Sequence, residues 1–157
     1  NFLTEHGISS YGELESKLTA VSARRDTAHA EIKQIESRSA ELTLVMKHAG
    51  TYRQLKPLYD RYRKSNDKEK FLRGHESEII LFEAAARELK RLGAVPLPTT
   101  ESMKTELANL NAEKERLLAE YKAARTEAQE YDTVKQNVDA LLTVPKEQEQ
   151  QRRHELE

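Results

Sequence analysis

The sequence has 157 residues, of which 34% are charged and 37% hydrophobic, and its formal net charge is -1. The absence of Cys excludes disulfides and thiolate metal sites and fits a reducing, cytoplasmic environment. Only 5 Gly and 4 Pro are present, and so few turn-forming residues favour long helices with thin cores. No apolar run approaches the roughly 18 residues of a membrane span, so we expect no membrane contact.

Residues 1–10 are predicted to form a short entry segment. Phe2 and Ile8 are apolar and can fold back on the helix that follows, while Gly7 permits a turn. The sequence starts at Asn1 rather than with a methionine, which indicates a piece of a longer protein.

A first long helix is predicted over residues 11–49. Its stripe positions alternate between steps of 3 and 4 residues, which is the spacing of a helix that buries one narrow face against a partner of similar length. Ser10 and Glu13 have capping-box spacing at its start. We expect the stem of Arg25 to pack where this residue interrupts the stripe. The stripe consists of Tyr11, Leu14, Leu18, Val21, Arg25, Ala28, Ile32, Ile35, Ser39, Leu42, Met46 and Ala49.

Residues 50–98 are predicted to form a small helical tip. Gly50 and Pro57 interrupt the pattern of the first helix, and we expect a kink or break near Pro57 because proline lacks an amide donor. Asn66 is expected to cap a short helix that ends at Gly74. A further helix and a stiff Pro-rich connector complete the tip.

A second long helix is predicted over residues 99–143, capped by Thr99 or Thr100 and carrying the same alternating stripe. Folding it antiparallel on the first helix pairs residues whose numbers sum to about 149. The expected neighbours are Met46 with Met103, Leu42 with Leu107, Ile35 with Lys114, Ile32 with Leu117, Ala28 with Tyr121 and Leu18 with Tyr131. The predicted fold class is therefore all-α, a long antiparallel helical hairpin (coiled coil) with a small helical tip inserted between the two long helices.

Val144 and Pro145 are expected to end the second helix. Residues 144–157 are polar and are predicted to form a tail, either frayed or continuing as a charged helix. Its last residues, Leu156 and Glu157, fit either native sequence or a cloning remnant.

The sequence holds no motif of an active site or a metal site. Its 5 His are far apart, no Gly-rich phosphate loop or GxSxG elbow occurs, and the carboxylates are scattered over helical faces. We therefore expect no catalytic residue, no metal and no cofactor, and we do not expect this chain to be an enzyme by itself.

Positive charge gathers between Lys47 and Arg73, where nine Lys or Arg stand against three acidic residues, which leaves a local net charge of +6. Tyrosines are interleaved with these bases, and aromatic rings beside cations can stack on nucleobases while the cations neutralise phosphates. The alternative is that the tyrosines form the core of the tip and the bases form its solvated face. The candidate nucleic-acid contacts are Arg53, Lys56, Tyr59, Arg61, Tyr62, Arg63 and Lys64.

The segment from Tyr52 to Gly93 includes the stretches YDRYRKS and KEKFLRGHESEI, with AEIKQIESRSAEL before it and VPLPTTESMKTEL and AEYKAARTEAQEYDTVKQNVDALL after it. With these flanks it resembles the region after the catalytic domain in relaxases, the mobilisation nucleases of conjugative and mobilisable elements. The resemblance covers nearly the whole chain. It implies a parent protein that nicks one DNA strand through a tyrosine, aided by a metal held by histidines, in an N-terminal domain that lies outside this sequence.

The resemblance leads us to expect a non-catalytic helical accessory region of a DNA-nicking relaxase, acting in conjugative transfer or in plasmid or transposon mobilisation. The expected partners are DNA, bound non-specifically or as a single strand, and proteins of the relaxosome or transfer machinery. Two alternatives stay open. One is a purely structural or protein-binding coiled coil that forms a homodimer, and the other is a helical arm that grips structured RNA.

Overall fold

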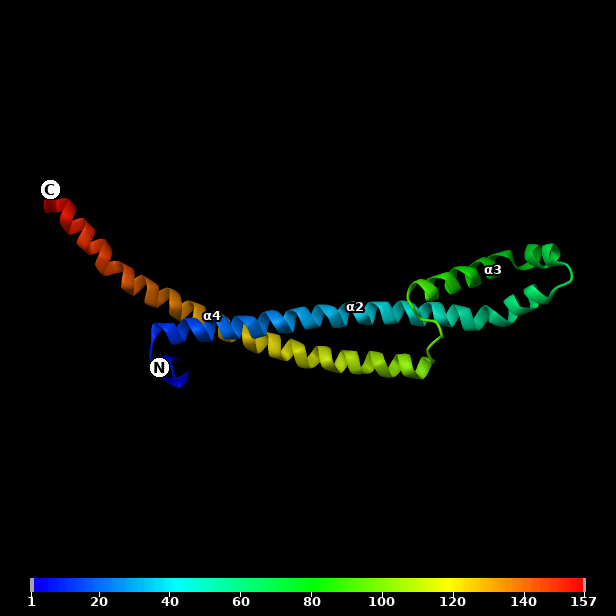
Figure 1. The fold of residues 1–157 in the computed structure, drawn as a ribbon, viewed down its shortest axis with the longest axis horizontal. Helices are drawn as coiled ribbons and strands as arrows, with labels where there is room; N and C mark the ends of the chain where they lie inside the picture. The colour runs from blue at the N-terminus through cyan, green and yellow to red at the C-terminus, as the bar shows by residue number, and fades with distance from the viewer. Residues whose placement is uncertain (1, 157) are drawn as a thin grey trace. The chain divides into compact units, whose positions relative to one another are not determined.

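The computed structural model describes residues 2–156, with side chains up to residue 142. Within that range the chain forms four helices and no strand, so the predicted all-α class is confirmed (Figure 1). The helices are α1 (Phe2–Glu5), α2 (Tyr11–Lys64), α3 (Lys68–Arg91) and α4 (Thr100–Leu156).

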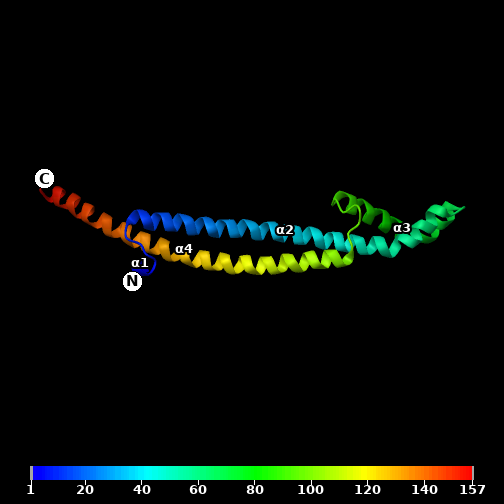
Figure 2. The same cartoon turned by 60° about the horizontal axis from the view of Figure 1, so that its bottom comes forward.

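Two compact units make up the chain. The first unit comprises Asn1–Ile32 with Glu115–Glu157, and the second comprises Lys33–Lys114. Each unit contains one segment of α2 and one segment of α4, and within each unit these segments run side by side in opposite directions (Figure 1, Figure 2). The predicted antiparallel pairing of the two long helices is therefore present in both units.

The core of the first unit is a thin layer between α2 and α4. Small residues of α4 allow the two helices to approach closely, and the ring of Tyr131 meets Phe2 edge-on with 5.2 Å between ring centroids. Phe2 and Ile8 pack against this core, as the sequence predicts. The buried residues are Leu14, Val21, Ala124, Ala128 and Tyr131.

Contacts between α2 and α4 fix their register. In the first unit the ring of His29 lies 5.7 Å from that of Tyr121. In the second unit Nζ of Lys114 lies 3.4 Å from a carboxylate oxygen of Glu36. Both contacts fall one position after the predicted α2 residue, so at these two places the pairing agrees closely with the prediction.

The core of the second unit joins all the elements of that unit. Residues of α2 pack against α3, against the connector that follows α3, and against the start of α4. Met46 and Leu107 pack at its edge, in the same cluster as their predicted partners Met103 and Leu42. The buried residues are Leu42, Val45, Ala49, Leu89, Ala94 and Met103.

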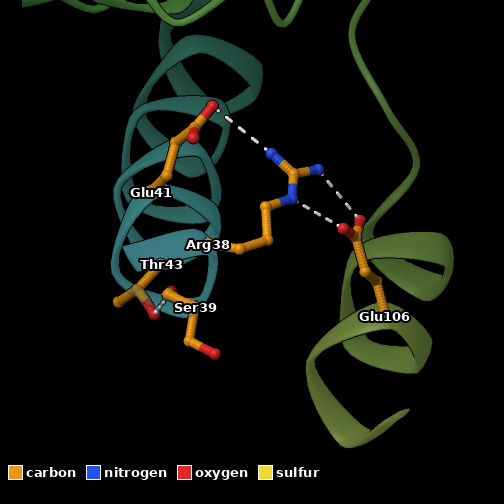
Figure 3. Close-up of polar contacts among 5 residues, drawn as sticks. All are labelled: Arg38, Ser39, Glu41, Thr43 and Glu106. Atoms are coloured by element: carbon orange, nitrogen blue, oxygen red, sulfur yellow. Dashed lines mark hydrogen bonds and ion pairs between the residues drawn. The ribbon is translucent and has the colours of Figure 1, made fainter. Parts of the chain in front are cut away.

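A bidentate ion pair reinforces the second unit beside this core. The guanidinium of Arg38 on α2 donates to both carboxylate oxygens of Glu106 on α4, at 2.7 and 3.2 Å, and also to Glu41 at 3.3 Å (Figure 3). The hydrogen bond to Glu106 raises the pKa of Arg38. Both side chains are partly exposed, so the pair adds orientation more than stability.

The first long helix does not end at residue 49, because α2 continues through Gly50 and Pro57 to Lys64. The reason is tertiary packing. Tyr52 and Tyr59 stack on Phe82 of α3, with ring centroids 4.8 and 4.3 Å apart, and they hold the helix on both sides of the proline. One missing amide donor is not enough to break a helix that is anchored on each side.

Helix α3 begins one residue later than predicted and carries the predicted interruption. Asp67 rather than Asn66 caps it, since the Asp67 carboxylate accepts a hydrogen bond from the Lys70 amide at 3.1 Å. At His75 the backbone leaves helical geometry, with φ -136° and ψ 25°. The short helix predicted to end at Gly74 and the further helix predicted after it are thus one helix, with a kink directly after Gly74.

The second long helix starts as predicted and runs further. The hydroxyl oxygen of Thr99 accepts a hydrogen bond from the Ser102 amide at 3.1 Å, which identifies Thr99 as the cap. The backbone of α4 continues past Pro145 to Leu156, so the predicted end at Val144 and Pro145 is wrong. The Lys, Glu and Gln residues after the proline have high helix propensity, which favours continuation.

The start of α2 uses both members of the predicted capping pair, with one difference. The Ser10 hydroxyl accepts a hydrogen bond from the Glu13 amide at 3.2 Å, as expected. The Glu13 carboxylate instead accepts from the amide of Ser9 at 2.8 Å. This bond lowers the pKa of Glu13 and ties the entry segment to the helix.

Candidate nucleic-acid interface

The turn between α2 and α3 is built by short-range hydrogen bonds. The amide of Ser65 donates to the carbonyl of Tyr62 at 3.2 Å, and the amide of Asp67 donates to the Ser65 hydroxyl at 3.2 Å. With the Asp67 cap on α3, these bonds reverse the chain within three residues. The basic ends of α2 and α3 are thereby brought together.

Six exposed cationic residues surround this turn, three from the end of α2 and three from the start of α3. We refer to this group of six residues as the basic turn. They stand against only two acidic residues, Asp67 and Glu69, so the local net charge is +4. None of the six forms an ion pair with another residue in the described part of the chain. The basic turn consists of Arg61, Arg63, Lys64, Lys68, Lys70 and Arg73.

Three of the predicted contact residues, Arg61, Arg63 and Lys64, belong to the basic turn. The guanidinium carbon of Arg61 lies 5.7 Å from the centroid of the Phe71 ring, which fixes the cation across the turn. Because these charges have no carboxylate partner among the described residues, a phosphate can approach them without displacing an ion pair.

Two other predicted contacts, Arg53 and Lys56, have partners within the protein. Arg53 donates to the hydroxyl of Thr100 at 2.9 Å and to the carbonyl of Pro98, so it ties α2 to the connector. Lys56 pairs with Asp60 at 2.9 Å, and this hydrogen bond raises the pKa of Lys56. Both are therefore weaker candidates for phosphate binding than the cations of the basic turn.

The tyrosines of the tip pack against α3. Tyr59 stacks on Phe82, and Tyr62 lies 6.0 Å from Phe71 between ring centroids. All three tip tyrosines, including Tyr52, are only half-buried. They therefore serve as core of the tip while part of each ring stays accessible.

A groove with a volume of about 440 Å³ opens between α2 and α3, beside the basic turn. Its wall is aromatic and its rim is charged, and we refer to it as the aromatic groove. It is lined by Tyr52, Lys56, Tyr59, Asp60, Arg63, Phe82, Glu83, Ala86 and Arg87.

Nothing in the local sequence distinguishes the α3 side of this groove from ordinary helix core. Phe82 is buried with helical core spacing, and such spacing normally marks a residue of the core alone. Only the fold of α3 back along α2 shows that its ring lies between Tyr52 and Tyr59. Arg87 joins the site for the same reason.

Three of the described histidines, His6, His29 and His75, pack against aromatic rings. His6 lies 5.4 Å from Tyr131 and His75 lies 4.7 Å from Phe71, measured between ring centroids. No group of three or more potential metal ligands comes together among the described residues. Over the same residues, no helix is both long and apolar enough to cross a membrane.

Comparison with known protein families, with curated proteins and with solved structures finds no match to this chain.

Proposed function

We propose that this chain is a non-catalytic helical region of a DNA-mobilising relaxase and that its basic turn holds DNA in the cytoplasm. The observation that supports DNA contact is the group of six exposed cations around the turn between α2 and α3, none of which has an ion-pair partner in the part of the chain with described side chains. The relaxase assignment rests on the resemblance of the sequence between Tyr52 and Gly93 and its flanks.

The charge distribution of the whole sequence favours this site. The net charge is -1 for the sequence and +4 for the basic turn, so the remainder carries -5. A polyanion is therefore attracted to the basic turn and repelled by the rest of the surface. Most of the binding free energy is expected from release of counterions from the phosphates.

A salt titration of DNA binding tests this role. The variant Arg63→Gln/Lys64→Gln/Lys68→Gln removes three exposed charges of the basic turn. Each phosphate contact to a single strand contributes about -0.7 to the slope of log K against log salt, so the slope should become shallower by about 2. The affinity should fall at low salt and differ less at high salt.

A matched variant removes the same number of exposed cations elsewhere. Lys33, Lys122 and Arg125 are exposed, and their replacement by Gln should leave the slope unchanged. Equal slopes for the wild type and the basic-turn variant would show that this turn is not a DNA site.

The relaxase assignment has a separate test in the coding sequence. A domain with a histidine cluster and a tyrosine nucleophile, encoded in the same reading frame ahead of Asn1, is the expected finding. A complete reading frame that lacks both would remove the relaxase assignment and leave the DNA-binding proposal standing.

A second candidate function is that of a protein-binding or dimerising coiled coil. It is favoured by Ile80 and Leu81, adjacent on α3 and 54% and 55% exposed, because exposed apolar neighbours often mark a binding surface. A sedimentation mass that rises with concentration, and no longer rises in Ile80→Lys/Leu81→Lys, would support this role. A mass that stays monomeric would oppose dimerisation.

A further inference from the structure

We propose that the aromatic groove binds one unpaired nucleotide of a single strand, with its base against the aromatic wall and its phosphate at the basic turn. This inference rests on the proposed function, in which the basic turn holds nucleic acid. It adds that the site distinguishes a single strand from a duplex.

The size and wall of the groove suit a nucleobase. Its volume of about 440 Å³ falls within the roughly 300–1,000 Å³ of small-molecule sites in proteins. Phe82 lies between Tyr52 and Tyr59, with ring centroids 4.8 and 4.3 Å from theirs. Phe82 is itself buried, so the accessible part of the wall is made by the half-buried rings of Tyr52 and Tyr59. Every nucleobase has a flat apolar face, so these rings can accept any of them.

The tyrosine hydroxyls add polar contacts at the same wall. Within the described part of the chain, the hydroxyls of Tyr52 and Tyr59 have no hydrogen-bond partner, and both residues line the groove. A phenol hydroxyl can donate or accept, so it can pair with either kind of group on the edge of a base.

The rim of the groove matches an anionic ligand and connects with the basic turn. Lys56 is compensated by Asp60, to which it is hydrogen bonded at 2.9 Å. The other charged residues of the rim are Arg63, Arg87 and Glu83, so the rim has a net charge of +1. Because Arg63 also belongs to the basic turn, a strand whose phosphates lie on that turn passes directly beside the groove.

Duplex DNA cannot make this contact. Its bases are paired and stacked inside the helix, so only their edges are exposed and no face can reach the aromatic wall. The basic turn can still bind the backbone of a duplex. The two forms should therefore differ in affinity by the contribution of the groove.

A variant that fills the groove tests the inference. Ala86 lines the groove and carries no charge, so Ala86→Leu occupies the space for a base without changing the electrostatics. Binding is measured with a labelled short oligothymidylate and with a duplex of the same length. The variant should bind the single strand about tenfold more weakly, in line with the loss of one stacked base, and should bind the duplex as the wild type does.

A matched substitution and a fold check accompany this measurement. Ala40 is exposed in the same unit and lies outside the groove, so Ala40→Leu should bind both DNA forms like the wild type. Circular dichroism melting checks that each variant is folded. An unchanged affinity of folded Ala86→Leu for the single strand, or an equal loss for both DNA forms, would overturn the inference.

Tyrosine fluorescence of the wild type gives a second readout that needs no variant. The chain has 6 Tyr and no Trp, so tyrosine emission is its intrinsic signal. Saturating oligothymidylate should quench this emission and the duplex should not. Equal responses to the two DNA forms would contradict base stacking in the groove.

The two proposals fail in different ways. If the basic-turn variant binds both DNA forms as the wild type does, the proposed function fails. If that variant weakens both forms while Ala86→Leu changes neither, the basic turn remains a DNA site and only the groove inference fails. A third result would assign the groove to a protein instead. In that case an amphipathic helix of a partner protein would bind the wild type without displacing either DNA form, and Ala86→Leu would abolish its binding.

Discussion

At the scale of single residues, Gly93 and Gly50 have opposite conformational requirements. Gly93 has a φ of 71° and follows α3 in a Schellman motif, where the amide of Ala94 donates to the carbonyl of Leu89 at 2.9 Å. Gly50 lies in the interior of α2. A Cβ added to either would meet no atom within 4 Å, so only the backbone conformation decides the effect.

Alanine at the two glycines should change stability in opposite directions. Gly93→Ala is expected to lower the free energy of unfolding by about 1 kcal/mol, because a side chain is strained at positive φ. Gly50→Ala should raise it by about 1 kcal/mol, because alanine is the better helix former. Urea unfolding measures both, and changes of the same sign would contradict this account.

The phenol of Tyr11 gives a prediction at high pH. Its hydroxyl donates to Asp139 at 2.6 Å, and this bond raises the pKa of Tyr11 from 10.0 to about 12. The stabilising contribution is complete below pH 10, where the phenol is protonated in both states. Between pH 10 and about 12 the unfolded state loses its proton first, so stability falls as pH rises through this range.

Tyr11→Phe should remove that part of the alkaline loss. The urea midpoint of the variant should decline less between pH 10 and 12 than that of the wild type. Tyr131 provides the comparison, because burial also raises its pKa and its contribution is retained in the variant. Superimposable pH profiles would show that the bond to Asp139 does not act on stability.

At the scale of the elements, the buried stripe of α4 can be tested with two neighbouring leucines. Leu117 is 1% exposed and Leu118 is 37% exposed. Leu117→Ala should lower the free energy of unfolding by about 3 kcal/mol, since it removes buried methyl groups and leaves a cavity. Leu118→Ala, the control on the same turn, should cost less than about 1 kcal/mol, and equal losses would contradict the assignment of the stripe.

Some helix boundaries follow from the local sequence, and others depend on tertiary contacts. The cap of α4 depends on neighbours along the chain, and Thr99, one of the two predicted candidates, forms it. The passage of α2 through Pro57 depends on Phe82, which is distant in sequence. Local rules cannot include a contact that exists only after α3 folds back.

At the scale of the whole molecule, the two long stripes should meet within one chain. Because the sequence has no Cys, the variant Glu36→Cys/Lys114→Cys introduces a single reactive pair at positions that form an ion pair. A short bifunctional maleimide should give a cross-linked monomer. Gel electrophoresis under denaturing conditions would show it as a monomer of altered mobility.

An offset pair controls for random collision. Glu36→Cys/Lys104→Cys places the second thiol ten residues, or about 15 Å, further along α4 at 1.5 Å per residue. It should give little intrachain product. Covalent dimers from the in-register pair at low protein concentration would mean that the stripes pair between chains.

The amino-acid sequence alone predicts the all-α class, the antiparallel pairing of the two long helices and the concentration of positive charge near the middle of the chain. Each of these depends on periodicity, capping residues or composition, which are properties of neighbouring residues. The folded arrangement, in turn, sets which cations have no ion-pair partner among the described residues. It engages Arg53 with the connector and leaves Arg63 exposed, and it places Phe82 of α3 against the tyrosines of α2. Those contacts join residues far apart in the chain, so only the folded arrangement reveals them.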